Sequence, residues 1–231
     1  MILKPRISDI FLTAAAFACL LLSIHAAQED LLPYGPNKGD KKFVWTASGT
    51  EKLKTPTSQC DDMTVDLNGC IYHARSSCSV ENVFRNYHNY GTISTTGSVY
   101  GRFVDDNDDT LQEMYRLIGK EYSPSLKPDW TYLATWENVG DDSGARDTFQ
   151  IVLMKKDDRY DAIYILGNVE RRVGTFAGTV LVPGQGNYIS KRLGFDQQQY
   201  PNNTNVGHTG VYYLTVEDGV VTVPGEEVIR K

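Results

Sequence analysis

The densest group of side chains that could do chemistry is the acidic run at residues 105–109, Asp-Asp-Asn-Asp-Asp. Clustered carboxylates supply the oxygen ligands that calcium prefers. An EF-hand loop beginning at Asp105 would need glycine at its sixth position and glutamate at its twelfth, where this chain has Thr110 and Arg116. The run therefore does not form that motif. A helix cap with a solvated acidic corner is the simpler interpretation, and an irregular surface calcium site is the alternative.

Three of the four cysteines, Cys60, Cys70 and Cys78, lie close together in the chain, and the fourth, Cys19, would be removed with the N-terminal segment 1–27 if that is a signal peptide. In an oxidising compartment an odd number leaves one thiol over, so we expect one local disulfide and either a free thiol or a bond to another chain. A zinc site with His73 as the fourth ligand is the alternative. The spacing Cys-x9-Cys-x2-His-x4-Cys lacks the Cys-x2-Cys pair typical of such sites.

Nucleophilic catalysis has one weak candidate, the Gly-Asp-Asp-Ser-Gly sequence at 140–144. It carries Ser143, but no histidine stands in a recognisable helper motif, and the reaction needs a base held against the serine. Glu137 and Asp161 could be imagined as an acid/base pair, although the sequence does not bring them together. No metalloprotease or phosphate-binding motif is present. We therefore expect a protein that is not an enzyme and uses no cofactor.

Asn202-Asn203-Thr204 is an acceptor sequence for N-glycosylation, with no proline at its middle position. It lies in a loop rich in Pro, Asn and Gly. We expect Asn202 to carry an oligosaccharide if the chain is exported, and an unmodified polar turn is the alternative.

Residues 1–27 have the composition of a secretory signal peptide. Lys4 and Arg6 precede the apolar run 10–24, and small residues follow it. About 15 apolar residues are short for a bilayer-spanning helix, which needs ~20; a single N-terminal anchor is the alternative. Without residues 1–27 the chain has 21 basic and 28 acidic residues, a net charge of −7. This charge disfavours nucleic acid as a partner.

The pattern of the remaining residues, 28–231, predicts a single, mostly antiparallel β domain with one helix, an α+β fold. Apolar and aromatic residues alternate at 130–136 and 148–154, which is typical of strands. An apolar stripe predicts a helix over 109–122 with Asp108 or Asp109 as its N-cap. Residues 211–216 and 220–223 flank Asp218-Gly219 and predict a hairpin. Residues 47–90 have the weakest pattern, for which we expect loops and short strands.

Tyrosines recur along these strands. Because their rings are apolar and their hydroxyls polar, packing within a sandwich with the hydroxyls at its rim is the simpler interpretation. An exposed aromatic strip for protein or glycan contact is the alternative. The tyrosines concerned are Tyr87, Tyr90, Tyr100, Tyr164, Tyr188, Tyr200, Tyr212 and Tyr213.

Several segments resemble the NIDO domain, the extracellular module of nidogen and related matrix and mucin-type proteins. They are Leu-Pro-Tyr-Gly-Pro-Asn-Lys-Gly-Asp at 32–40, Gly-Ser-Val-Tyr-Gly-Arg at 97–102, the strand Ala-Thr-Trp-x-x-Val-Gly at 134–140 followed by Asp-Thr-Phe-Gln-Ile-Val-Leu at 147–153, residues 161–170, and Gly194-Phe195. The stretch 41–90, which contains the cysteines, diverges from the family pattern.

The resemblance implies a secreted, non-enzymatic module that acts in cell–matrix adhesion or matrix assembly through contacts with extracellular matrix or cell-surface proteins. Two alternatives stay open: a secreted hydrolase whose site is not recognisable in the sequence, and a domain that binds a sugar or small ligand. Family members usually carry further modules, so the chain is expected to act as a lone module or to be part of a longer product.

Overall fold

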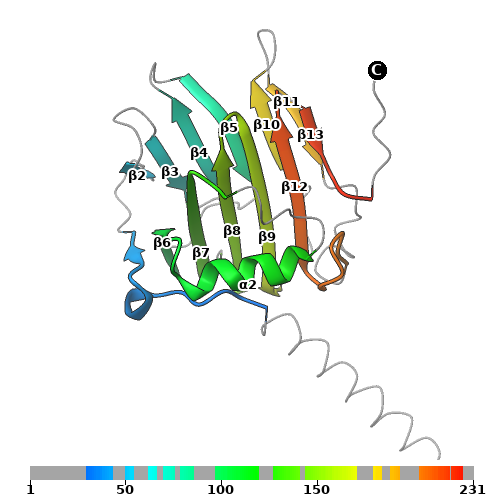
Figure 1. Ribbon diagram of the computed structural model, residues 1–231. Coiled ribbons are helices and arrows are strands. Elements are labelled where there is room, and N and C mark those ends of the chain that lie inside the picture. Colours follow the sequence, from blue (N-terminus) through cyan, green and yellow to red (C-terminus); the bar gives the residue numbers. More distant parts are fainter. Residues whose placement is uncertain are drawn as a thin grey trace, which may run out of the picture.

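The computed structural model describes residues 30–43, 50–54, 62–66, 70–75, 79–85, 97–119, 127–140, 144–170, 179–183, 188–192, 203–218 and 220–225. Two antiparallel sheets lie face to face, and a helix crosses the outer face of the larger sheet (Figure 1). This confirms the predicted α+β class, dominated by antiparallel strands with one main helix.

The larger sheet has seven strands in the order β1-β6-β7-β8-β9-β12-β13. Its three central strands are the longest, and their aromatic and β-branched residues suit a sheet that is buried on both faces. The strands are β1 (Lys41–Lys42), β6 (Ser98–Val104), β7 (Trp130–Gly140), β8 (Arg146–Lys156), β9 (Arg159–Val169), β12 (Val211–Glu217) and β13 (Val220–Thr222). The hairpin predicted around Asp218 is confirmed by the pairing of β12 with β13.

The alternation along β7 and β8 that the sequence predicted sends side chains into two separate cores. Tyr132 and Trp136 lie in the core between the sheets, where Trp136 stacks on Phe149 with ring centroids 4.9 Å apart. Leu133 and Val152 face the opposite way and pack beneath the helix. Because successive residues of a strand point to opposite faces, one central pair of strands supplies both cores.

Gly101 on β6 makes room for the aromatic packing between the sheets. A Cβ atom at this position would overlap the Tyr132 hydroxyl and lie 2.9 Å from Cε2 of Phe43. The absence of a side chain at Gly101 therefore lets two buried rings approach the backbone of β6.

The smaller sheet has six strands in the order β11-β10-β5-β4-β3-β2. They are β2 (Thr50–Lys54), β3 (Asp62–Asp66), β4 (Cys70–Arg75), β5 (Ser79–Arg85), β10 (Thr179–Pro183) and β11 (Tyr188–Arg192). Val65 and Ile71 are fully buried in the core that the two sheets share. Four strands of five to seven residues thus occupy a region for which the pattern predicted short strands and loops, and β3 and β4 pair on either side of Asn68-Gly69, a dipeptide that favours a hairpin turn.

Helix α2 (Asp109–Ile118) confirms the predicted helix and ends at Gly119. Asp108 is its N-cap and accepts a hydrogen bond of 2.8 Å from the Thr110 backbone N–H. The buried side is formed by Leu111, Met114, Leu117 and Ile118. Residues 120–122, the end of the predicted helix, lie outside the described residues.

Candidate functional site

The N-terminal segment at residues 32–40 folds into a turn, which includes the short helix η1 (Pro36–Lys38), and is fastened to β6. Asp40 Oδ2 accepts a hydrogen bond from the Gly35 backbone N–H. Gly35 has φ of 96°, a conformation that favours glycine. Arg102 on β6 donates to Asp40 Oδ1 over 2.6 Å and to the Pro33 carbonyl over 3.1 Å. The Asp40 and Arg102 side chains are 1% and 7% exposed, so this ion pair is internal.

The same arginine reaches the start of the helix. Arg102 donates to Thr110 Oγ1 over 2.9 Å and lies 3.5 Å from Asp108 Oδ2. Partial burial acts to raise the pKa of Asp108, but the hydrogen bonds from Thr110 and the charge of Arg102 outweigh it and lower that pKa. One side chain thus joins the N-terminal turn, the β6 strand and the helix N-terminus.

Gln150 on β8 holds the N-terminal segment at a second point. Its amide oxygen accepts from the Leu32 N–H over 2.8 Å, and its amide nitrogen donates to the Leu32 carbonyl over 2.9 Å. A further donation of 3.0 Å goes to Thr135 Oγ1. Gln150 is fully buried, and these bonds satisfy it in the way that a neighbouring strand would satisfy Leu32.

The residues before Gln150 fix two irregular points of the larger sheet. Asp147 accepts a hydrogen bond of 2.9 Å from the Glu170 N–H, just after β9 ends. Thr148 Oγ1 accepts one of 3.1 Å from the Asn138 N–H, where β7 shifts register and Asn138 has φ of 52°. The polar side chains of the Asp-Thr-Phe-Gln sequence therefore form hydrogen bonds that stabilise the fold.

A tyrosine pair lies where the N-terminal segment meets the edge of the sheet. Tyr34 donates to Glu137 Oε1 over 3.0 Å, and its ring centroid is 6.0 Å from that of Tyr100. Burial and the Glu137 carboxylate raise the pKa of Tyr34 to about 12. Lys42 lies over the Tyr100 ring at 5.8 Å. The hydroxyl of Tyr34 is therefore a neutral donor at physiological pH.

The packing predicted for the tyrosines is confirmed for those whose side chains are described, but the expected place of the hydroxyls at the rim is wrong for Tyr213, whose buried hydroxyl donates to Asp161. These four are at most 9% exposed: Tyr100, Tyr164, Tyr212 and Tyr213. The side chains of Tyr87, Tyr90, Tyr188 and Tyr200 lie outside the described part.

The imagined acid/base pair is not brought together. Glu137 aligns with Ser98, whereas Asp161 aligns through Met154 with Thr131, six residues along β7 from Glu137. At ~3.3 Å per residue this places them about 20 Å apart. Asp161 is 2% exposed and is held by Arg159 at 2.8 Å and by the Tyr213 hydroxyl. Ser143 lies outside the described residues.

The acidic run has structural partners of its own. Asp108 caps the helix, and Asp106 pairs with Lys127. Within the described residues no group of three or more Asp, Glu, His or Cys side chains is arranged to hold a metal ion. Asp108 thus supplies the helix cap that the sequence favoured.

Other candidates fall outside what the structure describes. Cys60, Cys78 and Asn202 are not described, and Cys70 is placed only as the first residue of β4. The zinc alternative and the disulfide expectation rest on these residues. The expected signal segment, 1–27, is likewise outside, and none of the helices that the structure describes is long and apolar enough to cross a bilayer.

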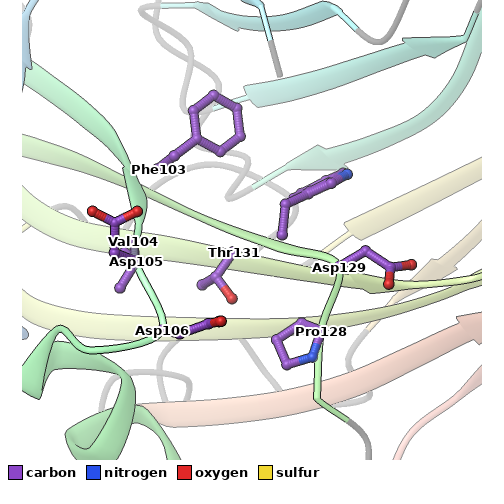
Figure 2. A pocket seen from close by; sticks show the side chains of 8 residues that line it. Phe103, Val104, Asp105, Asp106, Pro128, Asp129 and Thr131 are labelled. Carbon is purple, nitrogen blue, oxygen red and sulfur yellow. The ribbon is translucent and has the colours of Figure 1, made fainter. Parts of the chain in front are cut away.

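One pocket of about 250 Å³ opens where β6 and β7 separate. It is lined by Phe103, Val104, Asp105, Asp106, Pro128, Asp129, Trp130 and Thr131. Figure 2 shows the Asp106 carboxylate and the Thr131 hydroxyl pointing toward one another, whereas the Asp129 carboxylate points away. Phe103 and Trp130 belong to the core between the sheets, whereas Thr131 lies on the opposite face of β7.

Comparison with known proteins identifies the family but no individual relative. The model of the nidogen-like domain, NIDO, matches residues 82–218, more than half of the 231-residue chain. The match begins within β5 and covers the central strands, the helix and β12. No curated protein and no solved structure matches the chain. With its helix, its Asp-Thr-Phe-Gln strand and its buried Arg102 all inside the matched range, the chain belongs to the NIDO family of nidogen-like domains.

Proposed function

We propose that this protein is exported from the cell and works as a non-enzymatic adhesion module, binding extracellular matrix or cell-surface proteins. In this proposal residues 1–27 are a signal peptide, 28–231 form one domain, and Asn202 carries an oligosaccharide. One disulfide joins two of Cys60, Cys70 and Cys78, and the third thiol is free or bonds to another chain.

The family match over residues 82–218 carries this proposal, because NIDO domains are extracellular modules. The use of polar groups supports it. Gln150, Asp147 and Arg102 are occupied by hydrogen bonds that hold segments of the same chain together. The net charge of −6 also favours protein partners over nucleic acid.

The test is expression of the whole chain in a secretory cell line. The expected result is protein in the medium that begins near residue 28, loses mass on enzymatic deglycosylation, and no longer does so after Asn202→Gln. Electrophoresis with and without reductant separates a monomer from a disulfide-linked dimer.

Binding is then measured on surfaces coated with purified matrix proteins and on intact cells, with heat-denatured protein as control. Saturable binding of the native form alone is expected. Retention inside the cell would contradict export. Absence of binding, together with turnover of a chromogenic ester or glycoside, would replace the adhesion proposal with a hydrolase.

A further inference from the structure

The register of β3, β4 and β5 limits which of the three cysteines can meet. These strands are consecutive antiparallel neighbours in the smaller sheet (Figure 1). Cys70 is the first residue of β4, so it belongs to the end of the sheet where β3 leads into β4. Residues 55–61 join β2 to β3 and residues 76–78 join β4 to β5, and both connections belong to the opposite end. Cys60 and Cys78 fall in these two connections.

The length of β4 keeps Cys70 away from Cys78. Cys70 and Arg75 are the first and last residues of this strand, and Arg75 is opposite Ser79 on β5. At ~3.3 Å per residue, Cys70 is therefore about 16 Å or more from Ser79. Cys78 directly precedes Ser79, and consecutive Cα atoms are ~3.8 Å apart. The Cα atoms of Cys70 and Cys78 are thus at least about 12 Å apart, whereas a disulfide needs ~4.4–6.8 Å.

The same strand separates Cys70 from Cys60. Asp62, at the start of β3, is opposite Ala74, which lies about 13 Å along β4 from Cys70. Two chain links of ~3.8 Å connect Asp62 to Cys60. Only a chain that turned straight back along β3 would bring Cys60 to about 7 Å from Cys70, which is the limit for a bridge. Since β2 and β4 pair with the two sides of β3, the sheet leaves no place beside β3 for such a reversal.

No strand length separates Cys60 from Cys78. Asp62 and Ser79 lie at the same end of the sheet, and two strand spacings of ~4.8 Å place them about 10 Å apart. Cys60 is two residues from Asp62 and Cys78 is next to Ser79, so these short links can bring the two Cα atoms within bridging distance. A zinc site that used all three cysteines would also need Cys70 at this end, which the register opposes.

We propose that a disulfide joins Cys60 to Cys78 and that Cys70 forms no disulfide within the chain. This inference rests on the proposed function, since an exported protein passes through an oxidising compartment. The two thiols give up two protons and two electrons, and a low-molecular-weight disulfide such as oxidised glutathione takes them up and is reduced to two thiols. The bond closes a loop around the paired strands β3 and β4 and restricts the unfolded chain.

The test maps the cysteines of the whole chain after its secretion from a cell line. Free thiols are blocked with iodoacetamide in denaturant, and the unreduced protein is cut with trypsin and with a protease that cleaves before aspartate. The three cysteines then fall in separate peptides, residues 55–60, 66–75 and 76–85. We expect 55–60 to be linked to 76–85, and 66–75 to carry the blocking group or a bond to another chain.

Substitutions separate loss of the bond from other effects of each cysteine. Cys60→Ser and Cys78→Ser are each expected to lower the urea midpoint, and the double variant is expected to lie close to the single variants, because the same bond is lost in all three. Reductant is expected to lower the midpoint of the parent protein and to leave that of Cys60→Ser unchanged. Cys70→Ser is the matched control and is expected to keep the cross-linked peptide.

A link from 66–75 to either of the other two peptides would overturn the proposal. So would three blocked cysteines in the secreted protein, or loss of the cross-linked peptide in Cys70→Ser. Retention of the chain inside the cell would contradict the proposed export instead. In that case the chain is recovered, refolded with reduced and oxidised glutathione, and mapped in the same way, which decides the pairing independently of export.

Discussion

Replacement of Arg102 by methionine is expected to be among the most destabilising changes available in this protein. Methionine keeps much of the apolar stem, and removes the bonds to Asp40, Pro33 and Thr110. The Asp40 side chain, 1% exposed, is then left with no cation paired to it in the described part of the chain. Loss of one partner from a buried ion pair costs about 3–5 kcal/mol.

The reverse substitution, Asp40→Asn, is expected to cost less, about 1–3 kcal/mol. Arg102 still has Asp108 Oδ2 at 3.5 Å as a counter-charge, and an asparagine oxygen can still accept from the Gly35 N–H. The double variant Arg102→Met/Asp40→Asn removes the stranded charge. It is therefore expected to be more stable than Arg102→Met alone.

Urea unfolding at neutral pH, followed by tryptophan fluorescence, measures these differences through the midpoint and the slope m. Hydrogen exchange over residues 30–43 separates release of the N-terminal segment from global unfolding. Asp218→Asn, an exposed turn residue, serves as the control. Equal costs for the two single variants, or a double variant less stable than Arg102→Met, would refute the assignment of Arg102 as the counter-charge of Asp40 among the described residues.

Three further outcomes follow from the packing. Gly101→Ala is expected to lower the free energy of unfolding in urea by about 1–3 kcal/mol, because the new methyl group overlaps the Tyr132 hydroxyl. Adding Tyr132→Phe to the same chain is expected to recover part of this stability, and no recovery would contradict the clash. Gln150→Leu is expected to lower the free energy of unfolding by about 1–3 kcal/mol and to speed hydrogen exchange at Leu32, because the N–H and the carbonyl of Leu32 lose their partner. Gln112→Leu on the exposed helix face is the matched control. The hydrogen bond from Lys156 lowers the pKa of Asp129, so the stabilising effect of this pair is present above the unfolded pKa and is lost as the pH falls below about 4. In an acid titration, Asp129→Asn is therefore expected to lose less stability than the parent protein. An identical stability profile would count against the pair.

The sequence predicted those elements in which residue type and burial agree. The alternation of Trp130, Tyr132, Ala134 and Trp136 specifies one strand face, because each apolar side chain needs burial and the period of a strand is two. The helix followed from its apolar stripe and from an aspartate at its start. Both depend only on neighbours in the chain.

The hydrogen bonds and the ion pair that hold the N-terminal segment were not predicted, because the partner residues are remote in sequence. Gln150 binds Leu32 across 118 residues, and Arg102 binds Asp40 across 62. By type alone each would be assigned to the surface. One available signal was the position of Gln150 between Phe149 and Ile151, where a strand with apolar residues on both faces buries any polar side chain that it carries. The assembly of the short strands into the smaller sheet was not predicted for a related reason, since these strands lack a continuous apolar face in the sequence.

Polar groups that hold the fold together differ from polar groups that are free to bind a partner, and this difference indicates where the module would bind. The polar residues in the segments that resemble the family are occupied: Asp40 by Arg102, Gln150 by Leu32, and Asp147 by Glu170. A group that already holds the fold together loses stability if it turns to a partner, so recognition is expected to use groups whose internal bonds are weak. Among the described residues Asp106, whose ion-pair partner Lys127 is exposed, meets that condition. Substitution there is expected to change binding and leave stability nearly unchanged, whereas substitution of Arg102 or Gln150 is expected to change stability first and binding only as a consequence.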